Sequence, residues 1–162
     1  MRLNKYVFYV AVFVLTVFSG SLRALTAADQ KEIQQFQLTE DFLHRYEAAS
    51  AANRSHEDAE TDPKKVAAMM SSLDAMTAKV ESNPGTVALI AQHGLKPREV
   101  VVGGIVLMRV AMADSALANP ATARYVDKDK LPSEANMAFY RRHKAEITKL
   151  MQNSFGNSDG DK

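Results

Sequence analysis

Residues 97–118 read PREVVVGGIVLMRVAMADSALA, and this stretch decides the fold. It predicts one long helix, because Pro97 suits the first helical turn and Glu99 suits the positive end of the helix dipole. The dipeptide Asn119-Pro120 ends the helix, since proline disfavours α geometry at the preceding residue. The middle of the stretch is apolar on nearly every side, so we expect a buried helix surrounded by other helices.

Gly103 and Gly104 interrupt the apolar run of this helix. Each glycine costs a helix interior about 1 kcal/mol relative to alanine. We interpret the pair as a packing notch that lets another helix approach closely, and a bend or break is the alternative. The β-branched residues around the pair would favour a strand by propensity alone, but the rest of the chain offers no second strand. A membrane span is rejected because Arg109 ends the apolar run well short of about 20 residues.

The first residues resemble a secretory signal. A basic segment precedes an unbroken apolar run over residues 6–18, and small residues follow it. This pattern predicts a signal peptide over residues 1–27, cleaved after Ala27 or Ala28. The alternative is an uncleaved N-terminal anchor, although the apolar run is short for a full span.

Charge and cysteine content exclude several classes of function. The chain has a formal net charge of +1, but removal of Arg2, Lys5 and Arg23 with the signal leaves 17 Lys and Arg against 19 Asp and Glu. A mature net charge near −2 does not fit a nucleic-acid-binding protein, and we expect no stable membrane span after cleavage. The absence of cysteine excludes disulfides, thiolate metal sites, c-type haem attachment and thiol catalysis.

The remainder divides into a polar lead-in (28–38), one helical domain (39–152) and a disordered tail (153–162). We expect the domain to be a single all-α bundle of four to five helices around the central one. Its start and stop signals are Thr39, Asp62-Pro63, Asn83-Pro84, Gly94 and Ser133. The expected helices cover residues 39–52, 62–82, 84–93, 97–118 and 133–152.

No residue pattern assigns a catalytic, cofactor-binding or metal-binding site. His44, His56, His93 and His143 show no ligand spacing, and only His44 and His143 lie on helices expected to pack. The methionines fall on apolar helix faces, which favours core filling over copper binding. The segment 157–161 starts like a calcium loop but lacks its remainder. Nucleophile and phosphate-binding motifs are absent from the sequence, so we expect a protein that is not an enzyme.

Three short motifs carry a resemblance to small exported bacterial helical proteins of no assigned function. They are Asn83-Pro84-Gly85, the run from His93 to Glu99 (HGLKPRE), and the run from Asn136 to Tyr140 (NMAFY). That group has a Gly-Leu-Thr-Pro-Arg-Glu type of turn before a long alanine-rich helix, and this chain departs from it at Lys96. The resemblance implies an all-helical fold and export, with no site residues to carry over.

Together these observations predict an exported, periplasmic or secreted, non-enzymatic helical protein. Its expected partner is an unknown protein or a small apolar ligand bound between helices. The alternative function is a periplasmic metal or haem carrier that uses His44 or His143 together with methionine ligands.

Overall fold

The computed structural model describes residues 25–52 and 68–155. Within these ranges the chain forms eight α-helices and one 3-10 helix and no strand, which confirms the predicted all-α class. Residues 1–24 of the predicted signal peptide lie outside the described residues. The predicted helix start at Asp62-Pro63 lies outside them too. The elements are α2 (Ala27–Gln35), α3 (Glu40–Ala52), α5 (Leu73–Glu81), α6 (Pro84–Gln92), α7 (Pro97–Ala118), α8 (Pro120–Ala123), η1 (Lys128–Lys130), α9 (Glu134–Arg142) and α10 (Lys144–Phe155).

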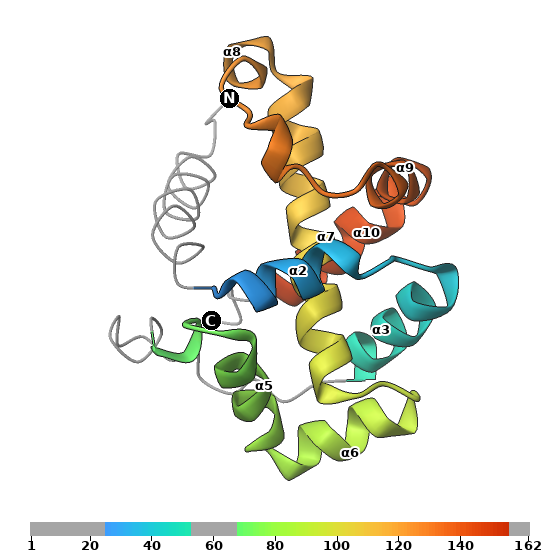
Figure 1. Cartoon of the computed structure of the whole chain (residues 1–162). Coiled ribbons are helices and arrows are strands. Elements are labelled where there is room, and N and C mark those ends of the chain that lie inside the picture. Colours follow the sequence, from blue (N-terminus) through green and yellow to red (C-terminus); the bar gives the residue numbers. More distant parts are fainter. Residues whose placement is uncertain (1–24, 53–67, 156–162) are drawn as a thin grey trace, which may run out of the picture.

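Helix α7 begins at Pro97 and ends at Ala118, as predicted. Lys96 offers no side-chain cap, and the Glu99 carboxylate instead accepts a hydrogen bond from the Lys96 backbone N–H at 3.3 Å. The helix is continuous through Gly103 and Gly104, so the break considered above does not occur. Figure 1 shows α7 running through the middle of the molecule, and it packs against α2, α5 and α9.

The expectation that α7 is buried on nearly every side is wrong, because only one face is fully covered. The most apolar stretch of 18 residues in α7 has a mean hydropathy of 1.8, and 28% of that stretch is buried. By length and composition this helix is apolar enough to cross a membrane, so Arg109 does not exclude a span as the sequence argument assumed. The core helix of a helical domain meets the same criterion. The buried residues of α7 are Val102, Gly103, Val106, Leu107 and Val110.

The two glycines form the predicted notch, and aromatic side chains of α3 occupy it. A Cβ atom placed on Gly103 would overlap the outer edge of the Phe42 ring at Cζ, and one placed on Gly104 would lie 3.0 Å from the Tyr46 hydroxyl. Phe42 also contacts Phe36 edge to face, with ring centroids 5.2 Å apart. The notch therefore receives side chains from α3, whereas we expected the approach of a helix backbone.

Helix α6 starts and ends where the sequence predicts. The Asn83 side chain accepts a hydrogen bond from the Thr86 N–H at 3.0 Å. At the other end Gly94 has φ 70°, and Leu95 N–H and Gly94 N–H bond the carbonyls of Ile90 and Ala91, each at 2.9 Å. This pair of hydrogen bonds is the Schellman motif, which needs the positive φ that glycine adopts without strain.

Two predicted helices are shorter than expected. The helix predicted over 62–82 is interrupted at residues 70–72, where the Ser72 hydroxyl accepts from the Ala75 N–H at 3.0 Å and starts α5 anew. The helix predicted over 133–152 is divided at His143, whose backbone has φ −106° and ψ 19°. Helices α9 and α10 therefore point in different directions (Figure 1). Helix α10 continues to Phe155, three residues into the predicted tail.

The segment predicted as a polar lead-in contains helix α2, packed on α7. Ile33 is 3% exposed, and the Arg98 guanidinium binds both oxygens of Glu32 at 2.9 and 2.7 Å. The sequence pattern missed this helix because Ile33 is its only large buried side chain.

A single cluster of buried apolar residues joins the helices. Its members come from α2, α3, α5, α6, α7, α9 and α10 and from two connecting residues, Leu38 and Leu95. The side chains with almost no exposure are Leu43, Leu73, Val102, Val106, Val110 and Ile147.

Candidate functional site

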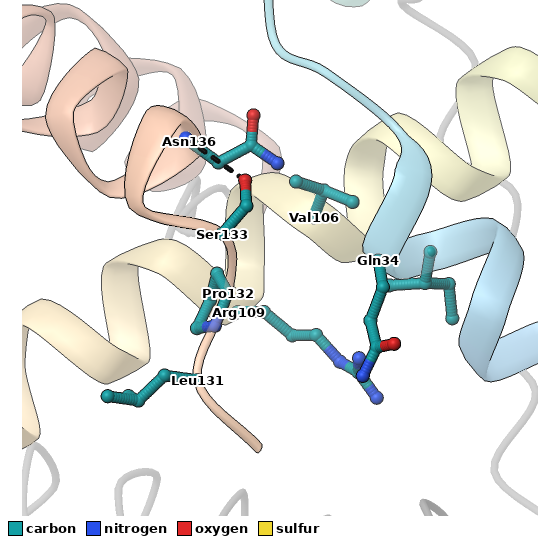
Figure 2. A pocket seen from close by; sticks show the side chains of 8 residues that line it. Gln34, Val106, Arg109, Leu131, Pro132, Ser133 and Asn136 are labelled. Carbon is teal, nitrogen blue, oxygen red and sulfur yellow. Dashed lines mark hydrogen bonds between the residues drawn. The ribbon is translucent and has the colours of Figure 1, made fainter. Parts of the chain in front are cut away.

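A recess lies where α2, α7 and the segment before α9 meet. Its cavity volume is about 10 Å³, room for about one water molecule, and it opens to solvent on one side. That is far below the roughly 300–1,000 Å³ of pockets that hold drug-sized ligands. Figure 2 shows most of the side chains around it, with Arg109 extending toward Gln34. The lining residues are Ile33, Gln34, Val106, Arg109, Leu131, Pro132, Ser133 and Asn136.

Arg109 brings a positive charge into this recess without an acidic partner. Its guanidinium donates a hydrogen bond to the Gln30 side-chain oxygen at 2.8 Å. Among the described residues it forms no ion pair, whereas Arg45, Arg98 and Arg141 each bind a carboxylate. Burial lowers the pKa of Arg109, because the half-buried guanidinium has lost part of its hydration. An unpaired charge in this position is costly to the fold.

Asn136 forms one wall of the recess and is held in place by two hydrogen bonds. The side chain is 2% exposed and bonds to two backbone groups about 100 residues away in the chain. Its oxygen accepts from the Leu38 N–H at 2.9 Å, and its NH₂ group donates to the Phe36 carbonyl at 2.8 Å. These bonds hold the connection between α2 and α3 against α9.

The lining of the recess combines one cationic group with polar and apolar side chains. Guanidinium groups bind carboxylates through paired hydrogen bonds, and Gln34 and Ser133 add polar groups at the wall. Ile33, Val106, Leu131 and Pro132 give the remaining surface an apolar character. The small apolar ligand expected from the sequence stays a prediction, and it would leave the charge of Arg109 without an acidic partner from the described residues.

A second polar cluster joins the two histidines that the sequence analysis singled out. Glu146 lies between them: its Oε2 is 3.1 Å from His143 Nδ1, and its Oε1 is 4.0 Å from His44 Nε2. His143 Nε2 is also 3.6 Å from Glu40. The His143 ring stacks on Phe139, with centroids 4.4 Å apart. When protonated, His143 would bind two carboxylates and connect the start of α3 to α10.

The geometry of this cluster falls short of a metal site. Among the described residues, no group of three or more His, Cys, Asp or Glu side chains is placed to hold a metal ion. His44 and Glu40 are largely exposed, with 68% and 69% of their side chains accessible.

The other residues considered from the sequence have structural positions. His93 is the C-cap of α6, whereas His56 and segment 157–161 lie outside the described residues. Met137 is a core residue, and Met76 and Met151 pack against the core. Met69, Met70, Met108 and Met112 are half-buried.

Arg109 and Glu146 were not predicted from the sequence as site residues. The sequence could have pointed to Arg109, because it is a charged residue within an otherwise apolar helical run. No sequence pattern could have pointed to Glu146, because its position between two histidines depends on how α3 and α10 pack.

The chain matches no protein-family model, no curated protein and no solved structure.

Proposed function

We propose that this chain is an exported, non-enzymatic helical protein that binds a small ligand in the Arg109 recess. The observation that carries the proposal is the half-buried guanidinium of Arg109, which has no acidic partner among the described residues. A bound anion would supply the missing charge and recover the cost of desolvating the guanidinium.

The ligand class is a carboxylate with a short apolar chain. The carboxylate would bind Arg109, and the chain would lie against Ile33 and Leu131. The recess has room for about one water molecule as it stands, so a ligand of a few carbon atoms binds there only if the surrounding side chains move apart. Export is supported by the basic and apolar N-terminal pattern of residues 1–27. A periplasmic or secreted location would expose the recess to such metabolites.

The test is thermal unfolding of the exported protein with the straight-chain carboxylates from acetate to octanoate. The matching primary amides serve as neutral ligands of nearly the same shape. We expect a rise in melting temperature with one or more carboxylates and none with their amides. At 100-fold excess over the dissociation constant the stabilisation is about 2.7 kcal/mol.

Two variants of Arg109 separate binding from folding. Arg109→Gln should abolish the carboxylate effect without lowering the melting temperature of the free protein, because it removes an unpaired, half-buried charge. Arg141→Gln is the matched control at an exposed arginine that pairs with Asp114, and it should keep the carboxylate effect. A melting temperature that no carboxylate changes, or a free Arg109→Gln protein that is much less stable, would contradict the proposal.

The second candidate function is a metal carrier, and the position of Glu146 between His44 and His143 favours it. Imidazole and carboxylate ligands together suit Zn²⁺. Binding requires the exposed His44 ring to turn toward Glu146, because the described residues as placed hold no metal-ligating group of three. The methionine ligands that the sequence suggested beside His44 or His143 are not among the residues of this cluster.

Titration of the metal-free protein with Zn²⁺ tests this second function. One zinc ion per chain, lost in His44→Ala and in His143→Ala but kept in His93→Ala, would support it. Zinc binding that is absent or unaffected by His44→Ala would refute it.

A further inference from the structure

The folded domain begins before the predicted signal-cleavage site. Thr26 is the N-cap of α2: its hydroxyl accepts from the Asp29 N–H at 3.1 Å, and the Asp29 carboxylate accepts from the Thr26 N–H at 3.0 Å. The Thr26 carbonyl accepts the first helical hydrogen bond, from Gln30, at 3.0 Å. This reciprocal arrangement is a capping box, here with aspartate as the second partner.

The residues beside the cap are also part of the fold. Leu25 packs against the core cluster, and Asp29 is 6% exposed. Cleavage after Ala27 would remove both Leu25 and Thr26. Either cut would also leave a positively charged amino group in the first turn of α2, on Ala28 or on Asp29, where the helix dipole disfavours positive charge. Both cuts predicted from the sequence therefore damage α2.

We propose that a signal peptidase cleaves this chain on the N-terminal side of Leu25, so that the mature protein keeps Leu25 and Thr26. The inference rests on the export part of the proposed function. The Ser21–Leu22 bond is the best match, because Ser21 and Ser19 place small residues at the first and third positions before the cut. Hydrolysis there adds water across the amide, leaving a carboxylate on Ser21 and an amino group on Leu22.

The test expresses the full chain in a Gram-negative host and determines the N-terminal residue and intact mass of the periplasmic product. A product that begins between residues 22 and 25 supports the proposal. A product that begins at Thr26 or later overturns it, while export itself stands. A periplasmic chain that retains Met1 overturns this proposal and indicates an uncleaved anchor, whereas a chain that is absent from the periplasm overturns export as well.

Matched variants test the position independently. Ser21→Leu should abolish the wild-type mature product, because a bulky residue then occupies the position before the cut, whereas Ala28→Leu should leave the N-terminal residue unchanged. Loss of the wild-type product in Ala28→Leu alone would overturn the proposal.

A third measurement asks whether the exported protein uses Thr26. Thr26→Ala should lower the melting temperature of the exported protein by roughly 2–8 °C, the range expected for loss of one cap, and Thr26→Ser should restore it. Equal melting temperatures for Thr26→Ala and the unmodified protein would show that Thr26 is absent from the mature chain or does not cap α2.

Discussion

At Gly103 the absence of a methyl group sets how closely α3 lies against α7. The Phe42 ring occupies the volume that a Cβ atom would need, and Gly103 is fully buried. Gly104 is half-buried, and its nearest neighbour is the Tyr46 hydroxyl at the end of a longer side chain. Burial also raises the pKa of Tyr46, which keeps its hydroxyl neutral well above physiological pH. The two glycines are therefore unequal in what they contribute to packing.

We predict that Gly103→Ala lowers the free energy of unfolding by about 1–3 kcal/mol through overpacking. Gly104→Ala should cost less, because alanine gains helix propensity and the Tyr46 hydroxyl has room to shift. Gly104→Leu, with its larger side chain, should again cost about 1–3 kcal/mol. Urea unfolding of the three variants measures this order. If Gly104→Ala were the more damaging of the two alanine variants, the notch would be assigned to the wrong glycine.

The side chain of Asn136 satisfies two backbone groups that no helix can satisfy. Asn136→Ala should lower the free energy of unfolding by about 2–4 kcal/mol, since the Leu38 N–H and the Phe36 carbonyl lose their partners in a buried place. Chemical denaturation provides the measurement, and Gln152→Ala on an exposed position of α10 is the control. A cost below about 0.5 kcal/mol would mean that water replaces both bonds.

At the scale of single elements, Arg98 of α7 connects α2 and α5. It binds Glu32 of α2 through two hydrogen bonds and Asp74 of α5 at 2.6 Å. The hydrogen bonds from Arg98 lower the pKa of Glu32 below its ordinary value of 4.5. The unfolded chain therefore binds more protons than the folded one as the pH falls. This interaction stabilises the fold above about pH 4.5 and is lost as the pH falls through the lower, folded value.

Arg98→Met should therefore reduce stability at neutral pH and flatten its decrease between about pH 5 and pH 3. Because Glu32 is 42% exposed, we expect an effect of at most about 1 kcal/mol. Melting temperature as a function of pH measures it. Lys149→Met, at an exposed lysine without an ion pair among the described residues, should leave the curve unchanged. Parallel acid curves for Arg98→Met and the unmodified protein would show that the Glu32 interaction contributes nothing.

The helix ends that sequence reasoning located are those where a residue restricts the backbone by itself. Pro97, Asn83-Pro84 and Gly94 act through fixed φ, a side-chain cap and positive φ, and each lies where it was expected. The breaks at Ser72 and His143 were missed, because the apolar spacing of three and four residues continues across both. Helix α2 was missed for the opposite reason, since most of its stabilising contacts are a cap and an ion pair.

The candidate site was less predictable than the helices, because it depends on pairs of residues that are distant in the sequence. Arg109 stands out in the sequence as a charge on an apolar helix, but its lack of an acidic partner depends on the packing of α2 and α9 around it. Asn136 reaches residues 98 and 100 positions away. Helix periodicity contains no information about such contacts.

At the scale of the whole molecule, one apolar cluster includes residues from seven of the eight described α-helices. Helix α8 is the exception, with no buried residue, and the nearby end of α7 carries Leu117 with 37% exposure. Elements that share one core unfold together, whereas an element without buried contacts opens alone.

Unfolding of the described domain should therefore be a single cooperative transition from which α8 is excluded. Amide hydrogens of Val106, Leu107 and Val110 should exchange only through global unfolding, because these residues are at most 3% exposed and α2, α5 and α9 cover α7. Those of α8 should exchange orders of magnitude faster, since its opening exposes no apolar surface. Native-state hydrogen exchange at increasing urea measures both groups in one experiment. A contrary result would be exchange of α2 through a separate opening, at a free energy well below that of global unfolding. The Arg98–Glu32 interaction and Ile33 would then not couple α2 to the core. The cap at Thr26 would in that case contribute little to the stability of the mature chain.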